Sequence, residues 1–448
     1  MVAITKIFKK YDVRGIYPEE INGKIAAEIA RAFVIFIKEK FNIDKPVISV
    51  GRDGRNSSPE IYDNVCNALI TAGAIVKSLG IVTTPLAYFS SAIGKSEFSI
   101  MVTASHNPRI YNGLKFSKGV MPIFFENGLV EILKIYLQGK KIQGIGDIEM
   151  TNILTDYKKY LKSKFNFSGN RKFVVDAGNG VAGKVFESIA KEFNLNYIPL
   201  FFEINGDFPN HEANPVKEET LQDLKNKVLE SNADFGIAFD GDGDRFGLID
   251  ENGVFRTMDE IVALLVDSEL NKKKGEVFVD LRLSKLLDEI IESKGGKATR
   301  LPVGNPYYKK MLLNSDNAIL GAEFSGHIMF KENYCIDDAI FNFFKVLEIF
   351  EKDTRKVSEI LNQYKKYPKT PELNFTVEDA DKVLERIKSE FKDYKIEELD
   401  GITVKSENWW FNVRKSNTEP LVRLNAEAND EQQLNEIVEK IKNIISMN

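Results

Sequence analysis

The sequence predicts an α/β protein made of three related α/β/α domains with mixed, largely parallel sheets, followed by a smaller C-terminal α+β domain. Three observations predict this fold. A strand–turn–helix–strand pattern occurs three times, the C-terminal part follows a different pattern, and 448 residues are too many for one hydrophobic core.

Each repeat begins with an apolar run, breaks at an aspartate, continues as an amphipathic helix and ends in a second apolar run. The three repeats lie at residues 47–85, 173–200 and 277–304, and they break at Asp53, Asp176 and Asp280. Units of this kind build layered domains with largely parallel sheets. We interpret the repeats as three domains of one kind, although similar alternation occurs in α/β proteins generally.

The C-terminal part has apolar residues at helical spacing in 383–391 and 434–445, with three strand-like runs at 401–404, 409–413 and 421–428. The polar, proline-bearing stretch 362–373 is the best candidate for a linker. The predicted domains are therefore residues 1–149, 150–251, 252–362 and 363–448.

Composition excludes several classes of protein. The formal net charge of -5 gives no basic footprint for nucleic acid or for an anionic membrane. No apolar stretch approaches the roughly 20 residues needed to span a bilayer, and the N-terminus lacks the apolar core of a signal peptide. Cys66 and Cys335 are the only cysteines, so we expect no disulfide framework and a reducing, cytoplasmic location.

Asp240, Asp242 and Asp244 form the strongest chemical signal, in the segment DGDGDR after a strand-like run. In an extended chain alternate residues project to one side, so the three carboxylates are predicted to converge. They would repel one another without a cation, and hard oxygen ligands select Mg²⁺ or Ca²⁺. An EF-hand loop is excluded because Arg245 stands where that loop needs glycine. A purely structural polar turn remains the alternative.

Ser105 lies in TASHNP, residues 103–108, which follows the strand-like run FSIMV. The serine could be a nucleophile activated by His106, or a hydroxyl that carries a transferable group. It could equally be a turn residue, since Asn107-Pro108 favours turn initiation. Ser105 alone does not decide between these interpretations.

Two later stretches could bind a ligand, the first a phosphate and the second the hydroxyl groups of a sugar. Arg414, Ser416, Asn417 and Thr418 offer a guanidinium fork and short polar donors between two strand-like runs, which suits a phosphate dianion. Glu323, Ser325 and His327 alternate in GAEFSGH and could face one ligand. Alternatively, the first stretch is a simple hairpin turn, and the polar side chains of the second only make hydrogen bonds within their own loop.

Together these motifs resemble the α-D-phosphohexomutases, the phosphomannomutase/phosphoglucomutase group. TASHNP with YNGLK, DGDGDR, GAEFSGH and RKSNTEP occur in the family's order and approximate spacing, and the YDVRG opening, GRDGR, DAGNG and GDFPNHEANP also match. The resemblance covers essentially the whole chain. It implies four domains around a central cleft, in agreement with the repeats.

The resemblance also implies roles. Ser105 would be a phosphoserine, and Asp240, Asp242 and Asp244 would hold Mg²⁺ together with a phosphoserine oxygen. The phosphoryl group would pass between Ser105 and a hexose 1- or 6-phosphate through a hexose bisphosphate, which also serves as activator. Glu323 and Ser325 would bind sugar hydroxyls, and Arg414, Ser416, Asn417 and Thr418 the phosphate that is not reacting. The residues implied around the reacting phosphate are Arg14, Lys115, Arg245 and His327.

Two local features bear on this assignment. There is no G-x-S-x-G elbow around Ser105, and neighbours in an extended segment point to opposite sides, so we expect His106 to be poorly placed to deprotonate Ser105. The second feature is a departure from the family: Asn305 stands where many members have a histidine. Asparagine cannot act as an acid or base at neutral pH, although it can still bind sugar.

Two rival functions remain beside a mannose or glucose phosphate mutase. Phosphoglucosamine mutase shares the scaffold, and a metal-binding regulatory homologue without turnover is an alternative of another class. The expected partner is a hexose phosphate, with no nucleic acid and no membrane, and a homo-oligomer is compatible with the sequence.

Overall fold

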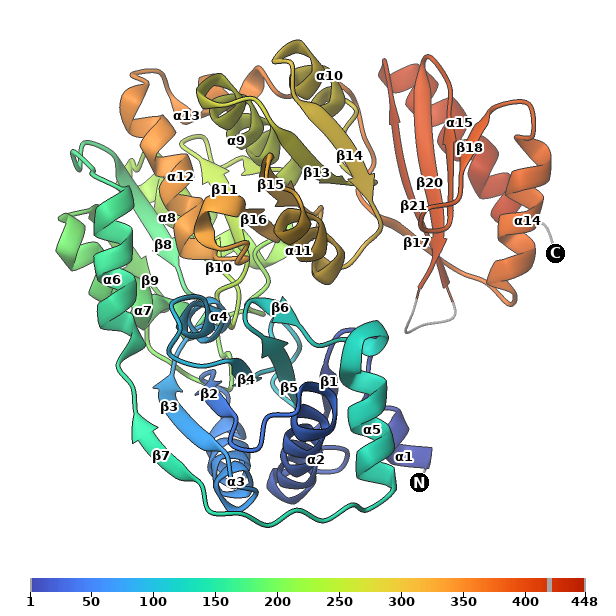
Figure 1. Cartoon of the computed structure of the whole chain (residues 1–448). Helices are drawn as coiled ribbons and strands as arrows, with labels where there is room; N and C mark the ends of the chain where they lie inside the picture. Colours follow the sequence, from blue (N-terminus) through green and yellow to red (C-terminus); the bar gives the residue numbers. More distant parts are fainter. Residues whose placement is uncertain (1, 417–420, 447–448) are drawn as a thin grey trace.

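The structure is a computed structural model that describes residues 2–416 and 421–446. Four sheets with their helices make up the molecule (Figure 1), and the predicted fold class is confirmed. The first sheet lies at the bottom of Figure 1, the second and third above it, and the fourth stands apart at the right. None of the helices in this part of the chain is long and apolar enough to cross a membrane.

The first sheet has the strand order β1-β5-β4-β2-β3-β7, and β6 pairs with β5. Its strands are β1 (Val13–Ile16), β2 (Val47–Arg52), β3 (Ile75–Ile81), β4 (Phe98–Val102), β5 (Tyr111–Lys118), β6 (Met121–Pro122) and β7 (Asp147–Met150). The associated helices are α1 (Val2–Thr5), α2 (Gly23–Phe41), α3 (Ser58–Thr71), α4 (Thr84–Ala92), the π-turn η1 (Phe125–Leu129) and α5 (Val130–Leu137).

The second sheet has the order β12-β11-β10-β8-β9. Its strands are β8 (Lys172–Asp176), β9 (Asn196–Leu200), β10 (Phe235–Phe239), β11 (Phe246–Asp250) and β12 (Phe255–Arg256), and its helices are α6 (Ile153–Lys164), α7 (Ala182–Phe193), η2 (Glu218–Leu221) and α8 (Gln222–Ser231). Because β12 pairs with β11, this sheet extends beyond the predicted boundary at residue 251.

The third sheet has the order β14-β13-β15-β16. Its strands are β13 (Glu276–Asp280), β14 (Lys297–Leu301), β15 (Ala318–Ala322) and β16 (Ile328–Phe330). Its helices are α9 (Met258–Lys272), α10 (Leu286–Ser293), α11 (Asn305–Asn314), η3 (Lys331–Asn333), α12 (Ala339–Lys352) and α13 (Val357–Asn362). One apolar cluster runs through the second and third units and reaches α4 of the first, so these parts share a core.

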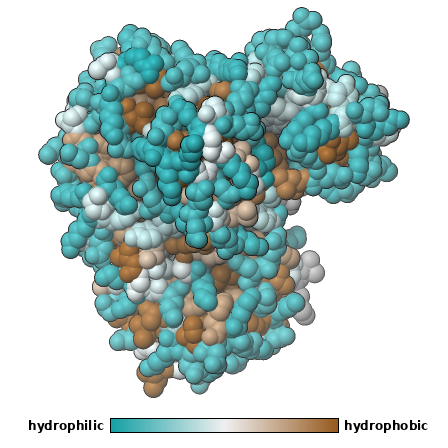
Figure 2. Space-filling view, turned by 45° about the horizontal axis from the view of Figure 1, so that its top comes forward, coloured by the Kyte–Doolittle hydropathy of each residue, from teal (hydrophilic) through white to brown (hydrophobic). Residues whose placement is uncertain are grey.

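The fourth sheet is antiparallel, with the order β17-β21-β20-β19-β18. Its strands are β17 (Leu373–Thr376), β18 (Lys395–Glu397), β19 (Ile402–Lys405), β20 (Trp409–Lys415) and β21 (Leu421–Ala428), and its helices are α14 (Ala380–Glu390) and α15 (Glu431–Ser446). The alternate apolar residues of these strands pack on the two helices in a core of their own. In the mostly hydrophilic surface of Figure 2, a notch separates this upper right lobe from the lower lobe.

The first three sheets share one topology, which confirms that the repeats are three related units. The strand orders β3-β2-β4-β5, β9-β8-β10-β11 and β14-β13-β15-β16 correspond, with three parallel strands and an antiparallel fourth. The connection between the last two strands carries Ser105 in the first unit, Asp240–Arg245 in the second and Glu323–His327 in the third. Three motifs that are far apart in the sequence therefore occupy equivalent loops.

Candidate active site

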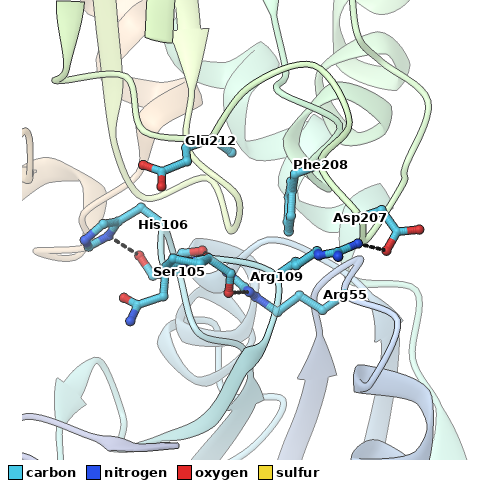
Figure 3. A pocket seen from close by; sticks show the side chains of 10 residues that line it. Arg55, Ser105, His106, Arg109, Asp207, Phe208 and Glu212 are labelled. Atoms are coloured by element: carbon cyan, nitrogen blue, oxygen red, sulfur yellow. Dashed lines mark hydrogen bonds and ion pairs between the residues drawn. The ribbon is translucent and has the colours of Figure 1, made fainter. Parts of the chain in front are cut away.

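Ser105 lies in the loop between β4 and β5, where the fully buried strand β4 ends. The residue is 2% exposed and has φ 53°, in the left-handed region. Its hydroxyl oxygen lies 3.3 Å from Asp240 Oδ2 and 3.1 Å from His106 Nδ1. The prediction that His106 points away from Ser105 is therefore wrong, because the backbone at Ser105 is turned rather than extended (Figure 3).

The three aspartates of DGDGDR converge as predicted, but a turn brings them together rather than strand alternation. Phe239 and Phe246 pair across the β10–β11 hairpin, and the segment between them folds back with Gly243 at φ 75°. Oxygens of Asp240, Asp242 and Asp244 all lie within 4.8 Å of one another, and all three residues are buried. The glycine supplies a backbone conformation that other residues rarely adopt.

Lys115 of β5 neutralises part of this charge. Its Nζ lies 2.8 Å from Asp242 Oδ2 and 2.8 Å from Asp244 Oδ2. Thr84, at the start of α4, donates a hydrogen bond of 2.6 Å to Asp242 Oδ2. Among the described residues, Oδ1 of Asp242 and Oδ1 of Asp244 are buried without a hydrogen-bond partner. Two such carboxylate oxygens beside Asp240 fit a hard divalent cation.

Burial and neighbouring charges shift the pKa values of the three carboxyl groups in different directions. Burial, with repulsion from Asp244 and Asp242, holds the pKa of Asp240 well above its usual value. Burial also acts to raise the pKa of Asp242, but the charge of Lys115 and its hydrogen bond outweigh it, and that pKa is lowered. The pKa of Asp244 is lowered as well, because Lys115, His327 and Arg245 outweigh burial.

A cleft of about 720 Å³ opens beside Ser105 and brings together side chains from the first three units. Its lining includes these predicted site residues and their neighbours: Arg14, Ser105, His106, Asn107, Lys115, Arg245, Asn305, Glu323, Ser325 and His327. Such a polar, multi-unit cleft with shifted carboxyl pKa values is the usual setting of an active site.

Cationic side chains surround the Ser105 end of this cleft. Arg14 of β1 donates to Asn107 Oδ1 at 2.6 Å and pairs with Asp12. Arg245 Nε donates to His327 Nε2 at 3.1 Å. Together with Lys115 these groups provide positive charge beside the serine, which suits an anionic phosphoryl group.

Comparison with known proteins identifies the family. Models described as phosphoglucomutase/phosphomannomutase α/β/α domains I, II and III match residues 5–132, 155–253 and 257–367, and the model of the C-terminal domain matches residues 372–444. The chain belongs to the phosphoglucomutase/phosphomannomutase family. The resemblance inferred from the motifs is thereby confirmed.

Relatives of known name agree with this family over their full length. The chain is 36% identical to the phosphomannomutase of Methanocaldococcus jannaschii, covering 98% of this chain and 97% of the relative. It is 33% identical to the phosphomannomutase/phosphoglucomutase of Pseudomonas aeruginosa, with 98% and 95% covered. The crystal structure of a phosphoglucomutase/phosphomannomutase family protein from Burkholderia thailandensis superposes with a TM-score of 0.90 at 30% identity, with 98% and 96% covered.

The third unit also lines the cleft. Glu323 accepts a hydrogen bond of 2.8 Å from the backbone nitrogen of Gly304, and burial raises its pKa. Ser325 and Asn305 face the same cleft. Asn305 donates a hydrogen bond of 2.7 Å to Asp337 Oδ2. The asparagine is thus built into the site as a hydrogen-bonding residue.

The sequence analysis missed Asp337, a buried residue that contacts the cleft residues Asn305 and His327. Besides Asn305, its carboxylate lies 3.1 Å from His327 Nδ1 and 2.5 Å from Lys309 Nζ. All of these partners are distant in sequence, so the only local signal is a pair of adjacent aspartates, Asp337 and Asp338, before the start of α12.

The fourth unit lies apart from the described lining of the cleft. Arg414 is a buried residue of β20, and its Nη2 lies 2.9 Å from Glu372 Oε2. Ser416 follows the same strand and receives a bond of 3.5 Å from Arg423. The predicted phosphate ligands Asn417 and Thr418 lie outside the described residues.

Proposed function

We propose that the protein is a phosphohexomutase that interconverts the 1-phosphate and the 6-phosphate of a hexose, mannose or glucose, in the cytoplasm. The observation that carries this proposal is the meeting of the Ser105 hydroxyl, the aspartate cluster and three cations at one end of a polar cleft. Membership of the phosphoglucomutase/phosphomannomutase family supports the same activity.

In the proposed reaction, phosphoserine 105 transfers its phosphoryl group to a free hydroxyl of the sugar phosphate. The bond from phosphorus to the new sugar oxygen forms as the bond to Ser105 Oγ breaks. Ser105 Oγ then attacks the other phosphate of the hexose bisphosphate, and the second sugar oxygen leaves. The positive charges of Lys115, Arg14 and Arg245 stabilise the phosphoryl group as it is transferred, since positioning and charge compensation are the main requirements of phosphoryl transfer.

We propose that Asp240, Asp242 and Asp244 hold Mg²⁺ with an oxygen of the phosphoserine. The ion would supply charge neutralisation for the phosphoryl oxygens. Glu323 and Ser325 would bind sugar hydroxyls, and His327, whose Nδ1 lies beside Asp337, would present Nε2 toward Arg245. His106 Nδ1 lies near enough to exchange a proton with Ser105 Oγ.

A panel of coupled assays tests the function. The 1-phosphates of mannose, glucose and glucosamine are supplied with Mg²⁺ and a catalytic amount of hexose bisphosphate, and the 6-phosphate is measured. Turnover of mannose or glucose phosphate supports the proposal. Turnover restricted to glucosamine phosphate would favour phosphoglucosamine mutase, and none with any sugar would favour a regulatory homologue.

Cation binding should release a proton and tighten as the pH rises. Asp240 binds a proton more readily than an ordinary carboxyl group, since burial and its neighbours raise its pKa, and a bound cation needs the ionised form. Calorimetric titration of Mg²⁺ in buffers of different ionisation enthalpy measures the released proton. Asp240→Asn should abolish the release, and a pH-independent affinity in the unaltered protein would contradict the prediction.

Arg414→Ala should lower kcat/KM by on the order of ten- to a hundredfold, mostly through KM. The proposed contact to the non-reacting phosphate is a charge-assisted hydrogen bond of roughly 1.5–3 kcal/mol, present in the ground state and the transition state alike. Steady-state kinetics measures the split, with the exposed Lys382→Ala as control in the same unit. An unchanged KM would show that this strand end only forms a hairpin.

A further inference from the structure

Arg55 is the largest fully buried side chain among the described residues, and the proposed mechanism gives it no role. The residue follows β2 by a short turn and is 1% exposed. It does not line the substrate cleft. It lines a neighbouring pocket of about 200 Å³, with Arg109, Asp207, Phe208 and Glu212 (Figure 3), and this pocket meets the cleft at the Ser105 loop.

Every N–H of the Arg55 guanidinium has an acceptor. Nη2 donates to the carbonyl oxygens of Ser105 at 2.6 Å and Asn107 at 2.7 Å. Nη1 donates to the carbonyl oxygens of Pro108 at 2.9 Å and Tyr111 at 3.1 Å. Nε lies 3.1 Å from Asp53 Oδ2. Since arginine has five donors in a fixed planar fork, this one side chain fixes the path of the chain from Ser105 to the start of β5.

A loop of the second unit also packs against the Ser105 peptide group. A Cβ added to Gly241 of the aspartate turn would lie 2.9 Å from the Ser105 carbonyl oxygen, so the two loops touch at this peptide. On the far side, the Phe208 ring lies 5.3 Å from the Arg55 guanidinium. Arg55 therefore holds the serine carbonyl against the turn that carries Asp240 and Asp242.

Arg282 occupies the equivalent position in the third unit, and its contacts show which part of the Arg55 arrangement is repeated and which is not. The backbone nitrogen of Arg282 donates to Asp280 Oδ1 at 2.8 Å, as that of Arg55 donates to Asp53 Oδ1 at 3.0 Å. Arg282, however, reaches Glu372 of the fourth unit instead of clamping its own loop carbonyls. The strand-end turn is thus a repeated structural element, whereas the clamp on carbonyls belongs to the unit with Ser105.

We propose that Arg55 is a positioning residue for phosphoryl transfer: it holds the backbone of residues 105–111 so that the Ser105 hydroxyl faces Asp240. The inference rests on the proposed mutase function. Because Arg55 lies outside the substrate cleft, its loss changes kcat and leaves the KM for the sugar phosphate nearly unchanged. A displacement of about 1 Å in a reacting group can cost roughly a hundredfold in rate.

The test compares Arg55→Lys with the wild type and with Arg109→Ala. Lysine keeps the charge but has one ammonium group, which cannot serve four carbonyls spread over seven residues. Arg109 lines the same pocket, is exposed and pairs with Asp207 at 3.2 Å, without touching the loop carbonyls in the described structure. Steady-state kinetics and hydrogen exchange of the 103–111 amides are measured on all three proteins.

We expect Arg55→Lys to lower kcat by about ten- to a hundredfold, with KM within about twofold of wild type. Exchange of the 103–111 amides should be about tenfold faster while other buried strands exchange as before, and Arg109→Ala should behave as wild type.

Wild-type kcat in a folded Arg55→Lys protein, or a loss carried by KM, overturns the proposal. If that variant does not fold, Asp53→Asn, which removes the Nε partner, must show the same pattern more weakly. A wild-type protein without mutase turnover refutes the proposed function, whereas exchange at wild-type speed in Arg55→Lys refutes the clamp itself.

Discussion

Replacing Ser105 with alanine should lower mutase turnover by roughly a thousandfold or more, the largest effect expected of any single substitution in this protein. The hydroxyl is the atom that accepts and returns the phosphoryl group in the proposed reaction. This hydroxyl lies beside Asp240 and His106. Among the described residues that line the cleft, the only other serine is Ser325, which belongs to the proposed sugar-binding loop of the third unit and so cannot replace Ser105.

Mass spectrometry provides the direct measurement. The intact wild-type protein should carry a fraction heavier by one phosphoryl group, and fragmentation should locate the group at Ser105. The fraction should increase on incubation with hexose bisphosphate and be absent from Ser105→Ala. An exposed serine of α6, Ser163→Ala, is the matched control and should keep both the modification and the activity. Wild-type rates in Ser105→Ala would end the phosphoserine assignment.

The sequence predicted the architecture because the information was local and repeated. Each of the three units begins with an apolar strand that ends at an aspartate, Asp53, Asp176 or Asp280, and helical spacing follows. A pattern that depends on alternation and turn residues can be recognised without knowing any distant contact. The same holds for the aspartate cluster, whose members are neighbours in the chain.

What could not be predicted depends on a single dihedral or on distant partners. The relation of Ser105 to His106 was predicted wrongly because φ of 53° at Ser105 reverses the expected alternation. The roles of Asp337 and Arg55 depend on acceptors and donors that other strands bring to them. A buried arginine and a buried aspartate look like surface charges in a sequence, since only the folded chain supplies their counterparts.

Asp242→Asn should reduce turnover at ordinary Mg²⁺ by roughly a hundredfold and shift the Mg²⁺ dependence to much higher concentration. The lowered pKa of Asp242 means that the carboxylate is ionised at neutral pH and contributes a full charge to the cluster. Asparagine keeps the shape and can still accept the hydrogen bond from Thr84, but it removes that charge. It also leaves Lys115 with Asp244 as its one remaining carboxylate partner among the described residues.

The excess positive charge on Lys115 would then oppose cation binding directly, so the loss should exceed that of an equivalent exposed ligand. Turnover measured against Mg²⁺ concentration gives the shift, and thermal unfolding shows whether the fold is retained. Asp207→Asn, at an exposed aspartate of the same unit, is the matched control and should leave the Mg²⁺ dependence as it is. Raising Mg²⁺ should restore part of the lost turnover, because Asp240 and Asp244 still lie within 4.8 Å of each other and Asp240 still lies beside the Ser105 hydroxyl. Turnover that proceeds equally well in excess chelator would show that the DGDGDR turn is structural and that Lys115 alone balances its charge.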